Sequence, residues 1–520
     1  MATVAAAAAT TDAPATANSV RDSIALPARP DGALPVYVDY NATTPLSESV
    51  CAAMQPFLVS GVSAATAGLF GNASSSHWYG AAAKQALEGA RASVARCINA
   101  SHPSEIVFLS GATESLNYAL SGGAHAQRSR TQGRNHVLSC AVEHVATLAI
   151  LERLREEGFE VSILPVDASG RVSAQQVREA LRPSTILVSL MLANNEVGSV
   201  LPLSEICSGV RSHPHGEDIW IHTDASQALG KIPVDVQSLG VDLLTIAGHK
   251  IYASKGVGAL YIRQGRVQAQ GGLRKFMVGA NHELDRRAGT ENTMLIAGLG
   301  AACAAFDSSQ KLQPLMRSFE SMRDELYTAI VDCLRREIPK QGLRDMYTVE
   351  GMDTATQAVA TTAAAAAAGS SSSSSSPAAS APRLAFVLHA SPQHRLSNTL
   401  SIGFLHINAS ALLHNLQAHV AASAGAACHA STVHLSYVLK AMGVAPEYGM
   451  GTLRLSVGRY NHIEELRQVG EWIGRAVVSM WMQQKSNREQ AEQAKLDASN
   501  YHTMQPKQVE PQEAKDGRAV

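Results

Sequence analysis

Seven short apolar runs, separated by segments with helical spacing, constrain the fold of this chain more than any other feature. The runs are often rich in β-branched residues, as buried strands are, and they span Glu105 to Leu109, His136 to Cys140, Val161 to Val166, Thr185 to Leu192, Ile219 to Thr223, Leu243 to Ile246 and Val257 to Ile262. One intervening segment opens with Ser173 and Gln176, the spacing of a helix capping box. This alternation predicts a three-layer α/β domain with a mostly parallel, seven-stranded sheet.

The length of 520 residues is enough for two hydrophobic cores. We place the larger domain at residues 35–294 and a smaller α+β domain at 295–480, where helical patterns dominate and short strands are expected near 400–404 and 452–456. The first residues of the larger domain are candidates to pack on the smaller one.

Three further segments have compositions that cannot bury enough apolar surface to offset chain entropy. We expect an unstructured N-terminal segment, an Ala- and Ser-rich surface insertion within the smaller domain, and a solvated polar tail, at residues 1–34, 351–382 and 481–520.

The net charge of −1 gives no field that would favour nucleic acid or an anionic membrane, so small-molecule chemistry is the better expectation. No apolar run approaches the roughly 18 residues that span a bilayer. The seven cysteines form no CxxC pair and their number is odd, which favours free thiols in a reducing compartment, and no metal site is expected. The acidic residues within 1–34 argue against an import signal, so we expect a cytoplasmic protein.

Lys250 ends an apolar run in Gly248-His249-Lys250, and Asp224 ends another. Polar groups at strand ends are where α/β enzymes keep their chemistry. An amine for a Schiff base and a carboxylate for a pyridinium nitrogen are the two protein groups that pyridoxal phosphate needs. The alternatives are a solvated surface lysine, as we expect for Lys255, and an aspartate that caps a helix beginning at Ala225.

The other parts of that cofactor also have candidate partners. Ser110-Gly111-Ala112-Thr113 follows a strand and opens a helical pattern, which suits a phosphate, although an ordinary capped helix has the same residues. His144 is placed to face the ring, and Asn195 and Gln227 carry amides suited to the phenolic oxygen. Taken singly, a structural histidine and an Asn-Asn turn are the plainer interpretations.

Ten motifs in one order make the chain resemble the class V aminotransferase family, in its NifS-like branch of cysteine desulfurases and selenocysteine lyases. The motifs are VDYNATTP at 38–45, GNASSSH at 71–77, SGATES at 110–115, Glu143-His144, NNEVG at 194–198, HTDASQ at 222–227, Gly248-His249-Lys250, RAGTENT at 287–293, GAACH at 425–429 and LRLSVGR at 453–459.

The resemblance implies a fold-type I enzyme that uses pyridoxal 5'-phosphate, and it implies a role for each matching residue. Lys250 resembles the Schiff-base lysine, Asp224 the pyridinium partner and His144 the ring-stacking histidine. Arg454 resembles the clamp of the substrate carboxylate, with Asn41 beside the substrate. The implied contacts of the phenolic oxygen and the phosphate are Asn195, Gln227, Gly111, Ala112, Thr113 and His249. Thr290 matches a threonine that reaches the neighbouring subunit's phosphate, so a homodimer is implied.

Cys428 matches the family's catalytic cysteine, whose thiolate would attack the substrate's sulfur or selenium and leave a persulfide or selenopersulfide with alanine. A small apolar residue in a Gly/Ala-rich turn is the plain alternative. Ala247, where many desulfurases have serine, points to selenocysteine lyase, whereas Val145 and the spacing from Cys428 to Ser436 point to desulfurases.

From these signals we expect a selenocysteine lyase that converts L-selenocysteine to L-alanine and selenium. A cysteine desulfurase that feeds iron-sulfur cluster or thiolation pathways, through an acceptor protein, is the alternative. A class V transaminase would not need Cys428, and a non-catalytic scaffold is expected to lack Lys250, Asp224 or Arg454, all of which are present.

Overall fold

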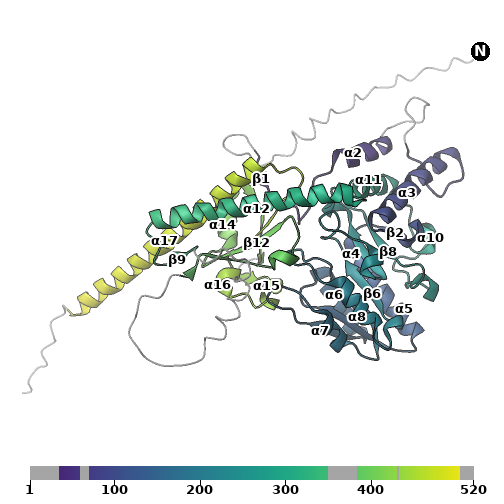
Figure 1. The fold of residues 1–520 in the computed structure, drawn as a ribbon, viewed down its shortest axis with the longest axis horizontal. Helices are drawn as coiled ribbons and strands as arrows, with labels where there is room; N and C mark the ends of the chain where they lie inside the picture. Colours follow the sequence, from purple (N-terminus) through teal and green to yellow (C-terminus); the bar gives the residue numbers. More distant parts are fainter. Residues whose placement is uncertain (1–33, 59–68, 350–382, 430–431, 504–520) are drawn as a thin grey trace, which may run out of the picture.

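The computed structural model describes residues 34–58, 69–349, 383–429 and 432–503, and it does not describe the side chains of 426–434 and 498–503. The predicted N-terminal segment, apart from Leu34, and the insertion at 351–382 lie outside the described residues. Figure 1 shows one end of the molecule built around a large sheet and the other around a smaller sheet beside two long helices.

The large sheet contains the seven predicted strands. They are β2 (Ile106–Leu109), β3 (His136–Cys140), β4 (Glu160–Leu164), β5 (Thr185–Ser189), β6 (Trp220–Asp224), β7 (Leu243–Ala247) and β8 (Gly258–Ile262), in the order β2-β8-β7-β6-β5-β3-β4. Only β8 runs in the opposite direction to the other six strands. The predicted mostly parallel sheet is therefore confirmed.

Helices cover both faces of this sheet, because successive strand residues point to opposite sides. Leu243 packs with α4 (Ala112–Asn117), the π-helical turn η3 (Tyr118–Gly122), α5 (Gly123–Arg130) and α6 (Val145–Glu156). Leu244 packs in the cluster that includes α3 (Trp78–Cys97), α7 (Ala174–Ala180), α8 (Leu203–Arg211) and α11 (Thr293–Ala304). The capping box predicted at Ser173 begins α7. The fold is the predicted three-layer arrangement.

The C-terminal part centres on a four-stranded antiparallel sheet of order β11-β12-β17-β14. Its strands are β11 (Phe386–Leu388), β12 (Thr399–Phe404), β17 (Thr452–Ser456) and β14 (Ser423–Ala424). It lies beside α14 (Ala409–Leu416), α12 (Ser309–Lys340) and α17 (Ile463–Thr503), of which the last two pack along each other (Figure 1). Near the start of the chain, β1 (Val36–Tyr37) pairs with β13 (Val420–Ala421). The predicted boundary between residues 294 and 295 stays a prediction.

The remaining elements are short. They are α2 (Glu48–Met54), η1 (Gln55–Phe57), η2 (Pro103–Glu105), η4 (Gly216–Asp218), α9 (Val236–Leu239), η5 (Gly248–Lys250), η6 (Gln268–Gln270), α10 (His282–Asp285), β9 (Tyr347–Thr348), β10 (Arg383–Leu384), η7 (Pro392–His394), α15 (Tyr437–Ala441) and α16 (Pro446–Gly449).

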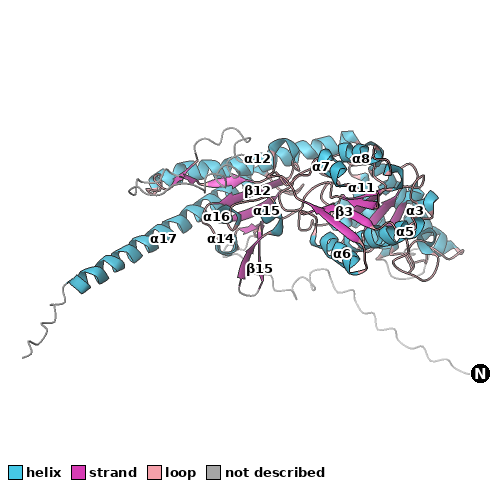
Figure 2. Ribbon diagram, turned by 90° about the horizontal axis from the view of Figure 1, so that it is seen from below, coloured by secondary structure: helices cyan, strands magenta, loops and turns pink. Residues whose placement is uncertain are grey.

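A two-stranded hairpin carries Cys428. Its strands β15 (Ala426–His429) and β16 (Thr432–Leu435) pair only with each other, with Cys428 opposite Val433. Figure 2 shows β15 standing out from the rest of the molecule.

The polar tail differs from the sequence-based prediction. Helix α17 continues to Thr503, so the described part of the expected unstructured segment is helical. Residues 486–497 are exposed as predicted, but Trp481 at the start of that segment is buried, so the predicted start at 481 is wrong. Glu, Gln, Lys and Ala are strong helix formers, and here the helix extends an element that is already nucleated by packing. No helix among the residues that the structure describes is long and apolar enough to cross a bilayer.

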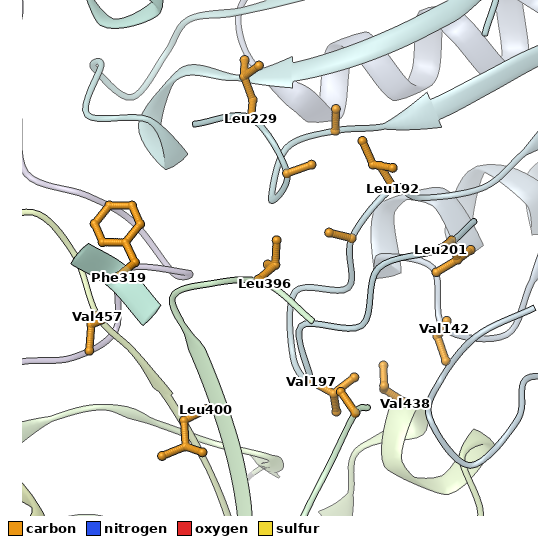
Figure 3. Close-up of a cluster of buried hydrophobic side chains, with 14 of the residues drawn as sticks. Val142, Leu192, Val197, Leu201, Leu229, Phe319, Leu396, Leu400, Val438 and Val457 are labelled. Atoms are coloured by element: carbon orange, nitrogen blue, oxygen red, sulfur yellow. The ribbon is translucent and has the colours of Figure 1, made fainter. Parts of the chain in front are cut away.

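One apolar cluster joins the two ends of the molecule. Figure 3 draws Leu192 and Leu229, from loops that follow strands of the large sheet, in the same buried cluster as Leu396 and Val457 of the C-terminal part. All four side chains are at most 3 % exposed. The loops between the two sheets therefore rest on a packed core.

Candidate active site

A cavity of about 700 Å³ opens where β6 and β7 end. Eleven of the residues predicted from the sequence line it: Asn41, Gly111, Ala112, Thr113, His144, Asn195, Asp224, Gln227, His249, Lys250 and Arg454. Of the other two, Thr290 does not line the cavity, and the side chain of Cys428 lies outside the described residues. The cavity thus gathers residues from the start, the middle and the end of the chain.

Lys250 lies on the cavity wall, directly after β7. Its Nζ donates hydrogen bonds to the backbone oxygens of Asn41 and Ala42, at 2.7 and 2.8 Å. Burial and the positive charge of Arg454 lower the pKa of Lys250 to about 8, against the opposing attraction of Asp224. A pKa of that value leaves about a tenth of the amine neutral at pH 7, which suits an amine that must bond to an aldehyde. These contacts exclude a solvated surface lysine.

Asp224 is the last residue of β6 and is 6 % exposed. Its Oδ1 accepts a hydrogen bond from the backbone N of Ser226 at 2.9 Å. The residues that follow form turns, and no helix begins at Ala225, so the helix-cap interpretation is wrong. A buried carboxylate on the cavity wall is what a pyridinium nitrogen requires.

The Ser110-Gly111-Ala112-Thr113 segment connects β2 to the start of α4. The backbone N–H groups in the first turn of a helix lack partners within the helix and attract anions. The helical path continues through η3 into α5. The backbone N of Ser110 donates to Glu114 at 2.7 Å, which ties the connecting turn to α4. This end of the cavity suits a phosphate.

His249 and Lys255 lie on the cavity wall. Burial, with the nearby Lys250 and Lys255, lowers the pKa of His249 to about 4, so its ring is neutral at pH 7. The ring Nδ1 lies 3.2 Å from the hydroxyl of Thr43. Lys255 is exposed, but it also lines the cavity, a placement that sequence analysis missed. Lys255 is five residues after Lys250, a spacing that matches neither a helical nor a strand period.

His144 is the N-cap residue of α6, and its ring Nδ1 accepts a hydrogen bond from the backbone N of Ala146 at 3.2 Å. Burial lowers the pKa of His144, and Lys250 adds to this effect while Asp224 opposes it. An accepting Nδ1 in a neutral ring places the proton on Nε2. His144 therefore caps α6 through Nδ1 and lines the cavity at the same time.

Arg454, on β17, is the only arginine among the described residues that line the cavity. Its Nη1 donates to the backbone oxygen of Asn195 at 3.1 Å, and its Nη2 donates to Asp39 Oδ1 and Ser423 Oγ, each at 2.9 Å. The pairing with Asp39 was not foreseen from the sequence. This pairing shows that the Arg454 guanidinium binds a carboxylate in this position. Binding of a substrate carboxylate requires the same geometry.

Another lysine, Lys231, lies behind the cavity wall, and the sequence analysis missed its placement as well. Lys231 Nζ donates to Gln227 Oε1 at 2.7 Å and to Asn41 Oδ1 at 3.0 Å. Gln227 Nε2 donates in turn to the backbone oxygen of Asn41 at 2.9 Å. The only sequence signal was its position in the turn four residues after Gln227.

Thr290 is exposed and does not line the cavity of its own chain. The loop before it is firmly held: Glu283 forms two 2.7 Å hydrogen bonds with the buried Arg91, and Arg287 contacts Glu114 at 2.9 Å. Three consecutive non-glycine residues from Glu283 have positive φ angles of 51°, 57° and 63°. Such backbone strain persists only where surrounding contacts enforce it, and it is concentrated at functional sites.

The base of the Cys428 hairpin is tied to cavity motifs. Ser436 donates from its hydroxyl to Glu196, beside Asn195, and Tyr437 donates to the backbone oxygen of Glu143 at 2.6 Å. Cys428 itself lies in β15, and its side chain is outside the described residues. The hairpin is thus attached at its base to the same loops that line the cavity.

The residues present fit pyridoxal phosphate. Two cavity-lining oxygens, Asn195 Oδ1 and Ser226 Oγ, are buried without a hydrogen-bond partner among the described residues, and Arg454 Nε is in the same state. Unpaired buried polar atoms are costly unless a ligand pairs with them. Together with an amine of lowered pKa and a buried carboxylate, they match a ligand that carries an aldehyde, a basic ring nitrogen and further polar groups.

Comparison with known proteins agrees with this arrangement. The aminotransferase class-V family model matches residues 36–378. The cysteine desulfurase IscS of Anaeromyxobacter sp. (strain K) is 36 % identical over 435 residues, which cover 83 % of this chain and 90 % of the relative. The IscS of Methanosarcina thermophila is 35 % identical over 437 residues, covering 84 % and 90 %.

Solved structures give the same result. A NifS-like protein matches 86 % of this chain and 99 % of its own, with 27 % identity and a TM-score of 0.67. The structure titled SspA in complex with cysteine matches 82 % and 99 %, with 29 % identity and a TM-score of 0.58.

The chain belongs to the class V aminotransferase family. Within that family, which uses pyridoxal 5'-phosphate, it is an enzyme of the cysteine desulfurase type, similar to IscS proteins. The predicted family, fold and cofactor are confirmed.

Proposed function

We propose that this protein is a cysteine desulfurase that converts L-cysteine to L-alanine and carries the sulfur as a persulfide on Cys428. The observation that carries the proposal is one cavity that holds Lys250, Asp224 and Arg454 together. The IscS relatives and the cysteine complex of SspA support cysteine as the substrate. They favour the activity that the sequence placed second over selenocysteine lyase, which it placed first.

In this proposal, Lys250 would bond the cofactor, Asp224 would pair with its ring nitrogen and His144 would cover its ring. Asn195 and Gln227 would contact the phenolic oxygen. Pyridoxal phosphate supplies an electron sink for negative charge at the α-carbon of a bound amino acid. The phosphate would lie at Gly111, Ala112, Thr113 and His249.

Arg454 binds the substrate carboxylate in this proposal, with Asn41 beside it. The substrate then competes with Asp39 for the guanidinium, because Nη2 already donates to Asp39 and Ser423. A planar fork binds two carboxylate oxygens at once, which fixes the amino acid in one orientation.

Lys250 is the residue suited to move protons at the α-carbon. A pKa of about 8 lies close to neutral pH, so the amine accepts a proton and returns it without a large barrier. Its two backbone acceptors hold Nζ in the cavity.

The Cys428 thiolate attacks the sulfur of the substrate. The S–S bond forms as the Cβ–S bond breaks, and a proton then completes the methyl group of alanine. Cysteine and one protein thiol thus become alanine and one protein persulfide, so no external oxidant or reductant is needed. An acceptor protein would remove the persulfide sulfur.

The proposed assembly is a homodimer in which Thr290 reaches the partner's phosphate site. Support comes from the anchored, strained loop that presents Thr290 at the surface, away from the cavity of its own chain. The contact of Arg287 with Glu114 links this loop to the segment of its own chain that would hold phosphate. A cytoplasmic location also remains part of the proposal.

Selenocysteine lyase is the second candidate, and one observation favours it. Ala247 lines the cavity with a methyl group where many desulfurases carry a serine hydroxyl. A selenol is more acidic than a thiol, so selenium leaves with less help from Cys428.

Alanine release by the PLP-loaded protein separates the two candidates. We expect L-cysteine to be turned over by the wild type and not by Cys428→Ala, with Lys250→Ala as the blank. A strong preference for L-selenocysteine that survives Cys428→Ala would make the protein a selenocysteine lyase. No alanine from either substrate would contradict both.

A further inference from the structure

Lys231 is a buried lysine that the proposed mechanism does not use. It is 5 % exposed and lies in the turn that follows β6. No carboxylate of the described residues lies within ion-pairing distance of its Nζ, and burial, with Lys250 and Arg454 nearby, lowers its pKa. Burial of an amine without a counter-charge is unfavourable, and two hydrogen bonds offset only part of that cost. The buried position of Lys231 therefore calls for a functional reason.

Both acceptors of Lys231 are side-chain amides that line the cavity. The amine, charged or neutral, carries at least two N–H donors, and these meet Gln227 Oε1 and Asn41 Oδ1. An amide that turned its NH₂ group toward Lys231 would place donor against donor when the amine is charged, and would give up one of these two hydrogen bonds when it is neutral. Each amide is therefore held with its oxygen facing Lys231.

Neighbouring contacts agree with these orientations. Gln227 Nε2 donates to the backbone oxygen of Asn41, the same carbonyl that Lys250 contacts. Asn41 Oδ1 also accepts from Asn398 Nδ2 at 3.2 Å, and Asn41 Nδ2 donates to Thr399 Oγ1 at 2.9 Å. The network has one consistent assignment of amide oxygens and nitrogens.

We propose that Lys231 is a positioning residue that holds the Gln227 amide with its NH₂ group presented to the cofactor and its oxygen turned away. The proposal rests on the proposed function only in taking Gln227 as a contact of the cofactor's phenolic oxygen. With an apolar side chain at position 231, Gln227 keeps only its contact with the backbone oxygen of Asn41. An amide that turns over would then place its oxygen against the negatively charged phenolic oxygen, which repels it.

The test is the pH midpoint at which the visible absorption band of the PLP-loaded protein changes, measured without substrate. A donor to the phenolic oxygen stabilises its negative charge and so lowers this midpoint. Lys231→Met and Gln227→Leu are each expected to raise it by roughly one pH unit, a tenfold change in the proton equilibrium. In Lys231→Arg the new side chain has N–H donors and no acceptor, so the pH midpoint is expected to stay near the wild-type value.

The double variant separates positioning from a simple charge effect. If Lys231 acts through Gln227, adding Lys231→Met to Gln227→Leu leaves the midpoint where Gln227→Leu alone puts it. A further rise in the double variant, or an unchanged midpoint in Lys231→Met alone, would overturn the proposal. Lys311→Met, which removes an exposed lysine bonded to Asp307, is the matched control.

Two further comparisons keep the test decisive. If Lys231→Met does not fold, Lys231→Arg takes its place. A midpoint in Lys231→Arg as high as that of Gln227→Leu would overturn the proposal, and a midpoint in Lys231→Arg equal to that of the wild type supports it. The absorption band and its pH midpoint do not depend on sulfur transfer. The test of Lys231 therefore stands even if the protein shows no desulfurase activity.

Discussion

The wall of the cavity and the Cys428 hairpin are built in opposite ways. Asp224 ends the central strand β6 and Lys250 follows the central strand β7. All residues of these two strands are buried, between helices on both faces of the sheet. The hairpin is a two-stranded sheet of its own, attached at its base through Ser436 and Tyr437. Two strands alone are marginally stable in water, whereas a covered parallel sheet is rigid. The comparison suggests a fixed site for cofactor chemistry and a separate, lightly supported carrier for sulfur.

The largest expected effect is at the fixed wall. Lys250→Ala removes the amine that bonds the cofactor and moves protons, so alanine formation falls by roughly 10³-fold or more. Turnover of L-cysteine by the PLP-loaded variant measures this, with the exposed Lys311→Ala as control. Alanine formation within tenfold of the wild type would remove Lys250 from the proposed mechanism.

Cys428→Ser tests whether the hairpin acts separately from the wall. Because a hydroxyl is a far weaker nucleophile than a thiolate, we expect alanine formation from cysteine to fall close to the Lys250→Ala background. The affinity for pyridoxal phosphate and the thermal unfolding temperature are expected to stay at wild-type values. A weakened cofactor affinity would show that the two regions are not independent.

Arg454→Lys probes the substrate end of the wall with a smaller effect. Lysine keeps the charge but loses the fork that contacts Asn195, Asp39 and Ser423, so KM for cysteine rises by about tenfold while kcat changes less. Steady-state kinetics measures the split, with Arg467→Lys at an exposed position as control. A fall in kcat at constant KM would place Arg454 in the chemical step instead.

The smallest expected effect is a shift with pH. The lowered pKa of Lys250 means that its amine loses its proton near pH 8, below the usual range for lysine. The rate at which the cofactor-free protein takes up pyridoxal phosphate is therefore expected to rise with pH, to reach half its maximum near pH 8 and to level off above about pH 9. Stopped-flow absorbance between pH 6.5 and 9.5 measures it, and a rate still rising steeply at pH 9.5 would contradict the shift.

The sequence predicted the parts that local pattern controls. Buried runs such as Leu243–Ala247 are apolar whatever their neighbours, and the Ser173 capping box needs only four residues, so the strands and α7 were foreseen. Lys250 and Asp224 were found because a polar residue that ends an apolar run is conspicuous. The helical tail was missed because a polar composition was taken as disorder.

Contacts between distant segments were beyond the sequence. Lys231 meets Asn41 across 190 positions, and Arg454 meets Asp39 across 415. Neither pair follows a helical or strand period, so only the folded chain reveals them. The placement of Lys255 on the cavity wall depends in the same way on how the turn after Lys250 folds back.

A single turnover tests most directly whether a fixed wall serves a separate sulfur carrier. The PLP-loaded protein is mixed with one equivalent of L-cysteine, alanine is quantified, and the peptide that carries Cys428 is weighed by mass spectrometry. We predict one alanine for each persulfide, with the additional sulfur on Cys428 and on none of the other cysteines. Alanine formed in full while the mass of the Cys428 peptide is unchanged would contradict the proposed mechanism.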